Sequence, residues 1–163
     1  MKRHLMTGAA ALLATLLIAA PAVARPLPTG GLTRQEMAAW LLDQGYSAEI
    51  HNDKGGVSII SSTIGPVNYD IYFNDCSGAR CQTLEFLAGW TPANSITLDE
   101  LNAWNATKRF VFGYRDKDLN LWVQTDIDIG SGGVWEEVTA SLARWEDGAT
   151  DFKGFIDRGG TLQ

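Results

Sequence analysis

Two hydrophobic periods alternate along the chain, and together they predict a mixed fold. Between residues 48 and 90, apolar positions recur at every second residue, in runs separated by short polar or glycine-containing turns. This period is typical of strands that bury one face. It returns over residues 110–129, where Phe110, Phe112 and Tyr114 alternate on one strand. Tight turns join the consecutive strands, so we expect an antiparallel sheet with one buried and one solvated face.

Capping boxes in the sequence predict where two helices begin. Thr33 precedes Glu36 by three residues, and Thr97 precedes Glu100 in the same way. In this motif the threonine side chain and the glutamate side chain each bond the other's backbone N–H. We expect the first helix to end at Gly45 and the second to run to about residue 108.

A third helix is predicted after the glycine-rich break at residues 130–133. Gly148 lies inside it and is a candidate for a kink. The element order α-β-β-β-β-α-β-β-α predicts an α+β fold, a two-layer sandwich with helices mainly on one face of an antiparallel sheet. The apolar stripe of the third helix comprises Trp135, Val138, Leu142, Trp145, Ala149, Phe152 and Ile156.

The first 24 residues have the three parts of a Sec-type signal peptide. Lys2 and Arg3 precede an apolar run that Pro21 ends, and a small-x-small sequence closes at Ala24. The run is shorter than the roughly 20 residues of a spanning helix. We therefore expect cleavage between Ala24 and Arg25 and a periplasmic or secreted protein. Arg25 stands where a lipid-anchored protein has cysteine, so no membrane anchor is expected. The predicted organisation is a signal peptide (1–24), a flexible N-terminal linker (25–31), a single domain (32–158) and a C-terminal tail (159–163).

Cleavage also makes the chain more acidic. Removing 24 of the 163 residues leaves 139, the usual size of one domain. The signal peptide takes Lys2 and Arg3 with it and no acid, which moves the formal net charge from −6 to −8. This charge argues against binding to nucleic acid or to an anionic membrane.

Both cysteines lie close together in the exported part. Cys76 and Cys81 flank a short turn that contains glycine, so we expect a disulfide that pins a hairpin. A redox pair or half of a zinc site are the alternatives. The spacing is not Cys-x-x-Cys and the sequence has no second cysteine pair, which makes both less favoured.

The sequence offers little catalytic or metal-binding chemistry. His51 is the single histidine after residue 24, at a strand end where we expect it to face solvent. Segments beginning at Asp116 and Asp126 resemble calcium loops, but each lacks required positions of the motif. Carboxylates that share the outer sheet face leave a glycoside hydrolase open as an alternative; these are Asp70, Glu85, Asp126 and Asp128. We expect no enzyme activity, no metal and no cofactor.

Aromatic residues supply the best candidate for a binding surface. Trp40, Trp104 and Trp145 fall on apolar helix faces and are expected in the core. Tyr72 and Trp122 instead fall on the polar parity of their strands. Aromatic side chains among Asp70 and Gln124 predict a surface for a partner or for a homodimer. The alternative is that the last helix or a loop covers them.

Two motifs resemble the YbjN domain family of bacterial proteins. The similarity extends over residues 32–156, and the Trp-Asn-x-x-Lys-Arg segment followed by an aromatic residue is its most specific part. The two motifs are Phe73-x-x-Cys76-x4-Cys81-x4-Phe86 and Asn102-x-Trp104-Asn105-x-x-Lys108-Arg109-Phe110.

The resemblance implies a regulatory protein of the Gram-negative envelope. The family is titled a sensory transduction regulator, and its fold is similar to the small chaperones of type III secretion, which dimerise and bind polypeptide segments. It implies a non-enzymatic, chaperone-like module that engages a protein or peptide partner, with no catalytic residue to carry over. Asn105 and Arg109 are expected to bond loop carbonyls and dock their helix on the sheet, with ligand binding as the alternative role. An envelope hydrolase, and an inhibitor that presents the cystine hairpin, are the alternatives.

Overall fold

The computed structural model describes residues 24–91, 96–130 and 132–162. The predicted signal peptide, except Ala24, lies outside the described residues, as does Ser131 in the glycine-rich break. The elements are α1 (Arg34–Asp43), β1 (Glu49–Asn52), β2 (Ser58–Ile64), β3 (Val67–Ser77), β4 (Arg80–Trp90), α2 (Leu98–Ala106), β5 (Phe112–Arg115), β6 (Leu121–Asp128) and α3 (Trp135–Asp157).

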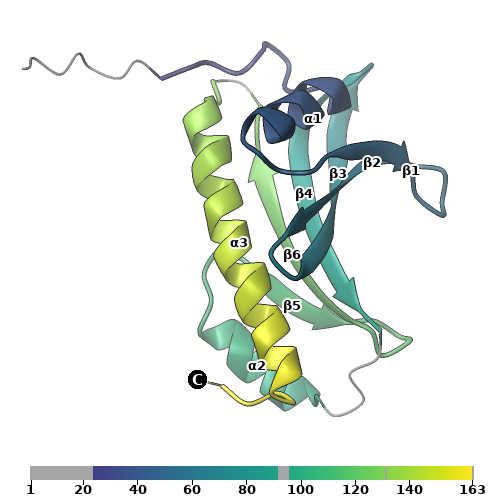
Figure 1. Cartoon of the computed structure of the whole chain (residues 1–163), viewed down its shortest axis with the longest axis vertical. Coiled ribbons are helices and arrows are strands. Elements are labelled where there is room, and N and C mark those ends of the chain that lie inside the picture. Colours follow the sequence, from purple (N-terminus) through teal and green to yellow (C-terminus); the bar gives the residue numbers. More distant parts are fainter. Residues whose placement is uncertain (1–23, 92–95, 131, 163) are drawn as a thin grey trace, which may run out of the picture.

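The predicted α+β sandwich is confirmed. Six strands form one antiparallel sheet in the order β1-β2-β3-β4-β6-β5. The three helices lie on the same side of it, with α3 along the middle, α1 at one end and α2 at the other (Figure 1). We call the side that they cover the inner face and the opposite side the outer face.

Both capping boxes are present at the predicted residues. Thr33 Oγ1 accepts from the backbone N–H of Glu36, and the Glu36 carboxylate accepts from the backbone N–H of Thr33 at 2.9 Å. Thr97 and Glu100 make the same reciprocal pair at the start of α2. Helix α2 ends at Ala106, two residues before the predicted end.

The core consists of inward-facing strand residues packed against α3. In β3, the residues Val67, Tyr69, Ile71 and Phe73 are buried, as their alternation predicts. The Trp145 ring from α3 contacts the rings of Tyr69 and Phe86, with centroids at 5.8 and 6.0 Å. Core positions for Trp40, Trp104 and Trp145 are thereby confirmed.

The aromatic residues of β5 point away from the core, although their alternation suggests a buried face. The alternating aromatics Phe112 and Tyr114 lie on the outer face, and Gly113 between them is buried. A Cβ on Gly113 would lie 2.6 Å from a Phe152 ring carbon and 2.9 Å from a Leu101 methyl. The absence of a side chain therefore lets both helices approach this strand, and the aromatics are left on the far side.

Helix α3 is continuous through Gly148. A Cβ at this position would lie 2.6 Å from both methyl groups of Val111. The glycine therefore serves close packing between α3 and the segment before β5, and no helix break occurs there. None of the helices in the described part of the chain is both long and apolar enough to cross a membrane.

Replacing Gly148 with alanine should destabilise the protein even though alanine favours helix. The helix propensity gain of about 1 kcal/mol is smaller than a typical overpacking penalty of about 1–3 kcal/mol. We expect a net loss of about 1 kcal/mol in urea unfolding, which a second change, Val111→Ala, should relieve.

Gly154→Ala in the same helix is the matched control. Its nearest neighbour is the terminal nitrogen of the long Arg158 side chain, at 2.8 Å, which can shift more readily than backbone, so this change should stabilise the protein by up to about 1 kcal/mol. Equal effects of the two alanine substitutions would contradict the packing explanation.

The segment before α1 differs from the flexible linker that composition predicts. Leu27 N–H donates to the carbonyl of Gly133 at 2.8 Å, and Trp135 N–H donates to that of Arg25 at 2.9 Å. Further on, Leu32 and Cys81 exchange both backbone hydrogen bonds, at 3.0 and 2.9 Å. Residues 25–32 thus run along the domain, pairing first with the start of α3 and then with β4.

Candidate protein-binding face

The outer face is built from side chains of all six strands. Along each strand every second side chain points to this face, and the cross-strand register aligns these outward side chains in rows. The residues are Glu49 and His51 of β1, Ile59, Ser61 and Thr63 of β2, Asn68, Asp70, Tyr72 and Asn74 of β3, Thr83, Glu85, Leu87 and Gly89 of β4, Phe112 and Tyr114 of β5, and Trp122, Gln124, Asp126 and Asp128 of β6.

Three aromatic rings form a row on the β5–β6 side of this face. Tyr114 stacks on Trp122 with ring centroids 6.4 Å apart, and Phe112 follows at 6.2 Å. Phe112 is 46% exposed, and the other two rings are half-buried. The described helices lie on the other face (Figure 1), so the alternative that the last helix covers Trp122 is not met, and the register places the three rings on the outer face.

Trp122 is held in place by two contacts. Its ring lies flat over Gly89, where a Cβ would come within 2.5 Å of the indole carbons. Its indole N–H donates to the Asp116 carboxylate at 2.9 Å. That bond, followed by bonds from Asn120 and Asp118, lowers the pKa of Asp116 to about 2. The Asp116 carboxylate is thus engaged within the β5–β6 turn, as expected for a hairpin rather than a calcium loop.

Tyr72 lies on the other side of the sheet centre. Its hydroxyl donates to Asp53 in the β1–β2 turn at 3.4 Å. Burial, followed by the nearby carboxylates of Asp53, Asp70 and Glu85, raises the pKa of Tyr72. Burial and then Glu85 raise the pKa of Tyr114 as well. Glu85 therefore acts electrostatically on both tyrosines, which places negative charge between the aromatic groups.

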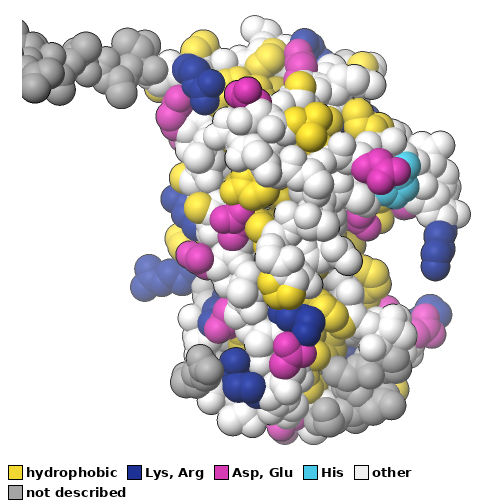
Figure 2. Space-filling view, viewed as in Figure 1, with side chains coloured by type: hydrophobic (Ala, Val, Ile, Leu, Met, Phe, Trp, Pro, Cys, Tyr) yellow, Lys and Arg dark blue, Asp and Glu magenta, His cyan; other side chains and the backbone are white. Residues whose placement is uncertain are grey.

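The charged side chains of the outer face are acidic. Its ionised residues are Glu49, Asp70, Glu85, Asp126 and Asp128, and none of the strand positions named above is lysine or arginine. Glu85 and Asp126 are direct cross-strand partners. On the helical side, in contrast, basic and acidic side chains are intermixed (Figure 2).

Glu85→Gln should therefore stabilise the protein. Like charges directly opposite each other in a sheet are unfavourable, and removing one should raise the free energy of unfolding by about 0.2–1 kcal/mol. Glutamine keeps the capacity to accept the bond that Asn74 donates at 3.3 Å. Thermal unfolding at low salt measures the gain in stability. This gain should shrink in 1 M salt because the screening length then falls to roughly 3 Å. A gain that is independent of salt would contradict an electrostatic origin.

A hollow of about 620 Å³ opens on this face between the strands and Trp122. Glu49 lies at its β1 side, Asp70 and Leu87 lie centrally, and the Trp122 ring borders it from β6. Asp70 accepts a hydrogen bond from the Ser61 hydroxyl, which orients its carboxylate. Asp70 and Trp122, both predicted from sequence, thus line one depression, whereas Glu49 and Leu87 were not identified.

The predicted partner residues lie together in space. Asp70, Leu87, Gln124 and Phe112 follow one another across β3, β4, β6 and β5 in the register. Tyr72 is in the next row, opposite Glu85. Asp70, Tyr72 and Gln124 are all half-buried. Phe112 was predicted as a strand residue but not as part of the partner surface, although the glycine that follows it is the signal that this strand turns its aromatic residues outward.

The acids proposed for a hydrolase lie on this same face but do not form a buried pair. Asp126 and Asp128 are exposed, as expected for the polar side of β6, and Asp70 and Glu85 are half-buried. Asp128 accepts from the backbone N–H of Gly130 at 2.8 Å. His51 is exposed on β1, as predicted.

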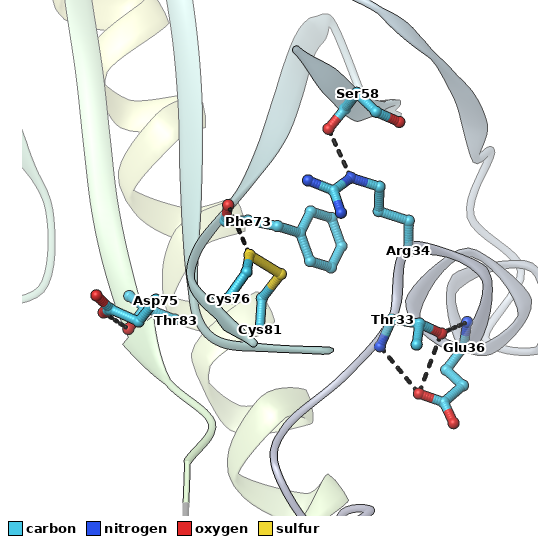
Figure 3. Close-up of a disulfide and its surroundings, with 9 residues drawn as sticks. All are labelled: Thr33, Arg34, Glu36, Ser58, Phe73, Asp75, Cys76, Cys81 and Thr83. Atoms are coloured by element: carbon cyan, nitrogen blue, oxygen red, sulfur yellow. Dashed lines mark hydrogen bonds between the residues drawn. A yellow bond between two sulfur atoms is a disulfide. The ribbon is translucent and has the colours of Figure 1, made fainter. Parts of the chain in front are cut away.

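The cysteine hairpin lies at the end of the sheet beside α1. Cys76 and Cys81 are bonded to each other and are register partners of β3 and β4 (Figure 3). Arg80 of the hairpin makes a two-pronged ion pair with Glu36, at 2.8 and 3.0 Å, and donates to the carbonyl of Gly31. The hydrogen bond from Arg80 has the largest effect on the pKa of Glu36 and lowers it. Bonds with Thr33 lower this pKa further, whereas burial acts in the opposite direction.

The Arg34 side chain adds a second link near the disulfide. Its guanidinium lies 4.8 Å from the Phe73 ring centre, and its Nε donates to the carbonyl of Ser58 (Figure 3). Helix α1 is thereby joined to the hairpin and to β2. The hairpin is held to the domain on one side, and residues 77–79 at its tip are exposed.

The Asn-x-Trp-Asn-x-x-Lys-Arg segment serves mainly to dock α2. The Trp104 indole N–H donates to Asp151 of α3 at 2.8 Å, and Lys108 forms an ion pair with the same carboxylate at 2.6 Å. Asn105 bonds both the N–H and the carbonyl of Gly113 in β5, at 2.7 and 2.9 Å.

Two residues of this segment point away from the docking contacts. Asn102 and Arg109 are exposed. The expectation that Arg109 bonds a loop carbonyl is not met among the described residues, and Asn105 docks the helix through the carbonyl of Gly113 in strand β5. Arg109 borders a second hollow together with Phe110 and Arg144, next to the acids of β6 and of the start of α3.

Comparison with family models matches residues 33–157 to YbjN, described as "Putative bacterial sensory transduction regulator". The match spans most of the chain and all nine helices and strands of its described residues. The chain belongs to the YbjN family. No match is found among curated proteins.

The matched range includes the segment that docks α2. Trp104, Asn105 and Lys108 tie α2 to α3 and to the edge of the sheet.

Proposed function

We propose that this YbjN protein is an exported, non-enzymatic regulatory protein that binds a protein or peptide partner through its outer face. The observation that carries the proposal is the row of Phe112, Tyr114 and Trp122 on a face that no described helix covers. Exposed aromatic groups with polar surroundings are typical of protein interfaces, and Trp and Tyr often supply much of the binding energy.

Aromatic side chains of the outer face are already held in place before a partner binds. Trp122 is fixed by Gly89 and Asp116, and Tyr72 is tied to Asp53. Side chains that are already ordered lose less conformational entropy when a partner binds. The family's description as a regulator supports a protein partner over a small substrate.

Export is supported by the signal-peptide pattern and by the contacts that follow it. Arg25, the first residue after the predicted cleavage point, already bonds α3 through its backbone and side chain. A disulfide between Cys76 and Cys81 is compatible with the oxidising periplasm. The N-terminal residue of the exported protein, read by mass spectrometry, tests this part of the proposal. We expect Arg25, and an intact Met1 would overturn export.

The two alternative functions receive less support from the geometry. A hydrolase needs a desolvated acid facing a second carboxylate, whereas Asp126 and Asp128 are exposed. An inhibitor that presents the cystine hairpin would use its charged residue, but Arg80 is engaged by Glu36 and Gly31.

Site-specific photo-crosslinking tests the binding face. A photoreactive phenylalanine analogue replaces Phe112 in one protein and Leu98 in another. Both side chains are well exposed, at 46% and 53%, but Leu98 belongs to α2. In cells that export the protein, we expect one discrete adduct from position 112 and none of the same mass from position 98. Unlabelled protein in excess should suppress it.

Several outcomes can be distinguished by mass. An adduct with a second protein supports partner binding, and one at twice the protein's own mass indicates a homodimer through this face. Identical adduct patterns from both positions, or no adduct from position 112, would overturn the outer face as the binding site.

A further inference from the structure

We propose that the segment bound by the outer face is cationic, with a lysine or arginine side chain in the hollow between Asp70 and Trp122. This inference rests on the proposed function and adds the chemistry of the partner. The occupant is a basic polypeptide segment with apolar residues between its charges.

The hollow has the groups that such a side chain needs. Asp70 supplies a carboxylate that Ser61 orients, and Glu49 supplies a second one from β1. The half-buried Trp122 ring offers an indole face, the best aromatic partner for a cation. Leu87 provides apolar surface for the methylene groups of the stem. A guanidinium or ammonium group would thus meet opposite charge and an aromatic ring together.

The rest of the face favours the same partner. Glu85 and Asp126 continue the negative charge beside the hollow, and Phe112 and Tyr114 continue the apolar surface. An extended strand shows its side chains on alternating sides. A segment that alternates or mixes basic and apolar residues would therefore complement this surface along its length.

Other occupants fit this charge poorly. In the hollow between Asp70 and Trp122, phosphates of nucleic acid or of anionic lipids would meet carboxylates, since Arg109 and Arg144 line the second hollow beside Asp126 and not this one. A second copy docked through the same face would bring two acidic faces together, an unfavourable pairing of like charges. Charge complementarity therefore selects a basic partner.

Defined peptides test this inference. A blocked peptide of alternating lysine and valine is titrated into the purified protein, followed by calorimetry and by the NMR signal of the Trp122 indole N–H. A peptide with glutamate in place of lysine is the comparison. We expect the lysine peptide to bind, the glutamate peptide not to bind, and the Trp122 signal to shift. The affinity should fall as salt is raised.

Two double variants remove the same charge from different places. Glu49→Gln with Asp70→Asn should weaken lysine-peptide binding about tenfold or more, since two charge pairs are lost. Asp43→Asn with Asp147→Asn, at exposed positions on α1 and α3, should change it less than about twofold because these charges are remote.

Equal weakening by the two double variants, or an unmoved Trp122 signal, would overturn the site. Binding of the glutamate peptide would overturn the cationic class. If crosslinking from position 112 still captures a partner in that case, the proposed function stands and the partner chemistry alone fails.

A separate observation concerns the start of the exported chain, where we infer that Glu136 binds the new amino terminus. The Arg25 backbone nitrogen lies 3.0 Å from Glu136 Oε2, and the Arg25 side chain lies 3.3 Å from Oε1. Hydrolysis of the Ala24–Arg25 bond by a signal peptidase consumes one water. It leaves a carboxylate on Ala24 and an amino group on Arg25, which takes up a proton near neutral pH.

The hydrogen bond thereby becomes an ion pair at the first turn of α3. Charge-assisted bonds are stronger than those from a neutral amide, so cleavage should secure residues 25–32 against the domain. The ion pair of the amino terminus depends on cleavage at Arg25 and is independent of which partner the outer face binds.

Thermal unfolding of two N-terminal forms tests this contact. Glu136→Gln should lower the Tm by about 1–3 °C more in the protein that begins at Arg25 than in one that retains Val23 and Ala24. Glu137→Gln, one residue further on, should act equally in both forms. An equal effect of Glu136→Gln in both forms would overturn the inference.

Discussion

Replacing Gly31 with alanine is expected to lower the free energy of unfolding by about 2–5 kcal/mol, the sum of a backbone term and a steric term. Gly31 has a φ of +92°, and an added Cβ would lie 1.9 Å from the carbonyl oxygen of Cys81. That carbonyl accepts the hydrogen bond from Leu32, which is fully buried. The substitution therefore forces the N-terminal segment off the sheet.

Gly30→Ala separates the two terms. Gly30 has a similar φ of +85°, but the nearest atom to an added Cβ is a side-chain carbon of Arg80 at 3.7 Å. We expect this change to cost about 1–2 kcal/mol, from the backbone conformation alone. Urea unfolding with the disulfide intact measures both variants. Equal losses for the two glycines would contradict a steric role of Gly31 and leave the segment only loosely attached.

Asn105→Ala has the second largest expected effect, a loss of about 2 kcal/mol. The change leaves the N–H and the carbonyl of Gly113 without their partner at the edge of the sheet, where the contact is partly buried. Alanine's helix propensity offsets a part of this loss. Urea unfolding gives the size of the effect, and faster hydrogen exchange of the Gly113 amide would locate it.

Asn102→Ala is the matched control in the same helix. Its side chain is exposed, so alanine should be neutral or stabilising by up to about 0.7 kcal/mol. Asn105→Asp should fall between, because a carboxylate can accept from the Gly113 N–H but cannot donate to its carbonyl. If Asn105→Ala behaves like Asn102→Ala, the docking role of Asn105 is wrong.

The features that sequence predicted best depend on near neighbours in the chain. Each capping box joins residues three apart, so the starts of α1 and α2 follow from Thr33 and Thr97 without knowledge of the rest of the fold. The buried parity of β3 follows equally from period-two alternation, because one face of the sheet must be covered. The hairpin between the cysteines is similarly local.

The incorrect or incomplete predictions depend on distant residues. Gly148 suggested a kink, yet its role depends on Val111, which packs against it from before β5. Residues 25–31 had the composition of a flexible linker, but backbone groups of Gly133 and Cys81 bond this part of the chain. Asn105 and Arg109 were both expected to dock α2, but among the described residues only Asn105 does so, through its two hydrogen bonds with Gly113.

For the proposed binding face, the sequence and the tertiary structure each determined a different property. The sequence alone determined that Tyr72 and Trp122 lie on the polar parity of their strands, since alternation assigns each side chain to a face. Whether that face is open was decided only when all described helices packed on the other side. Phe112 joined it because Phe152 and Leu101 approach Gly113 closely, a contact between elements far apart in the chain. Local periodicity assigns residues to faces, and long-range packing decides which face remains available to a partner.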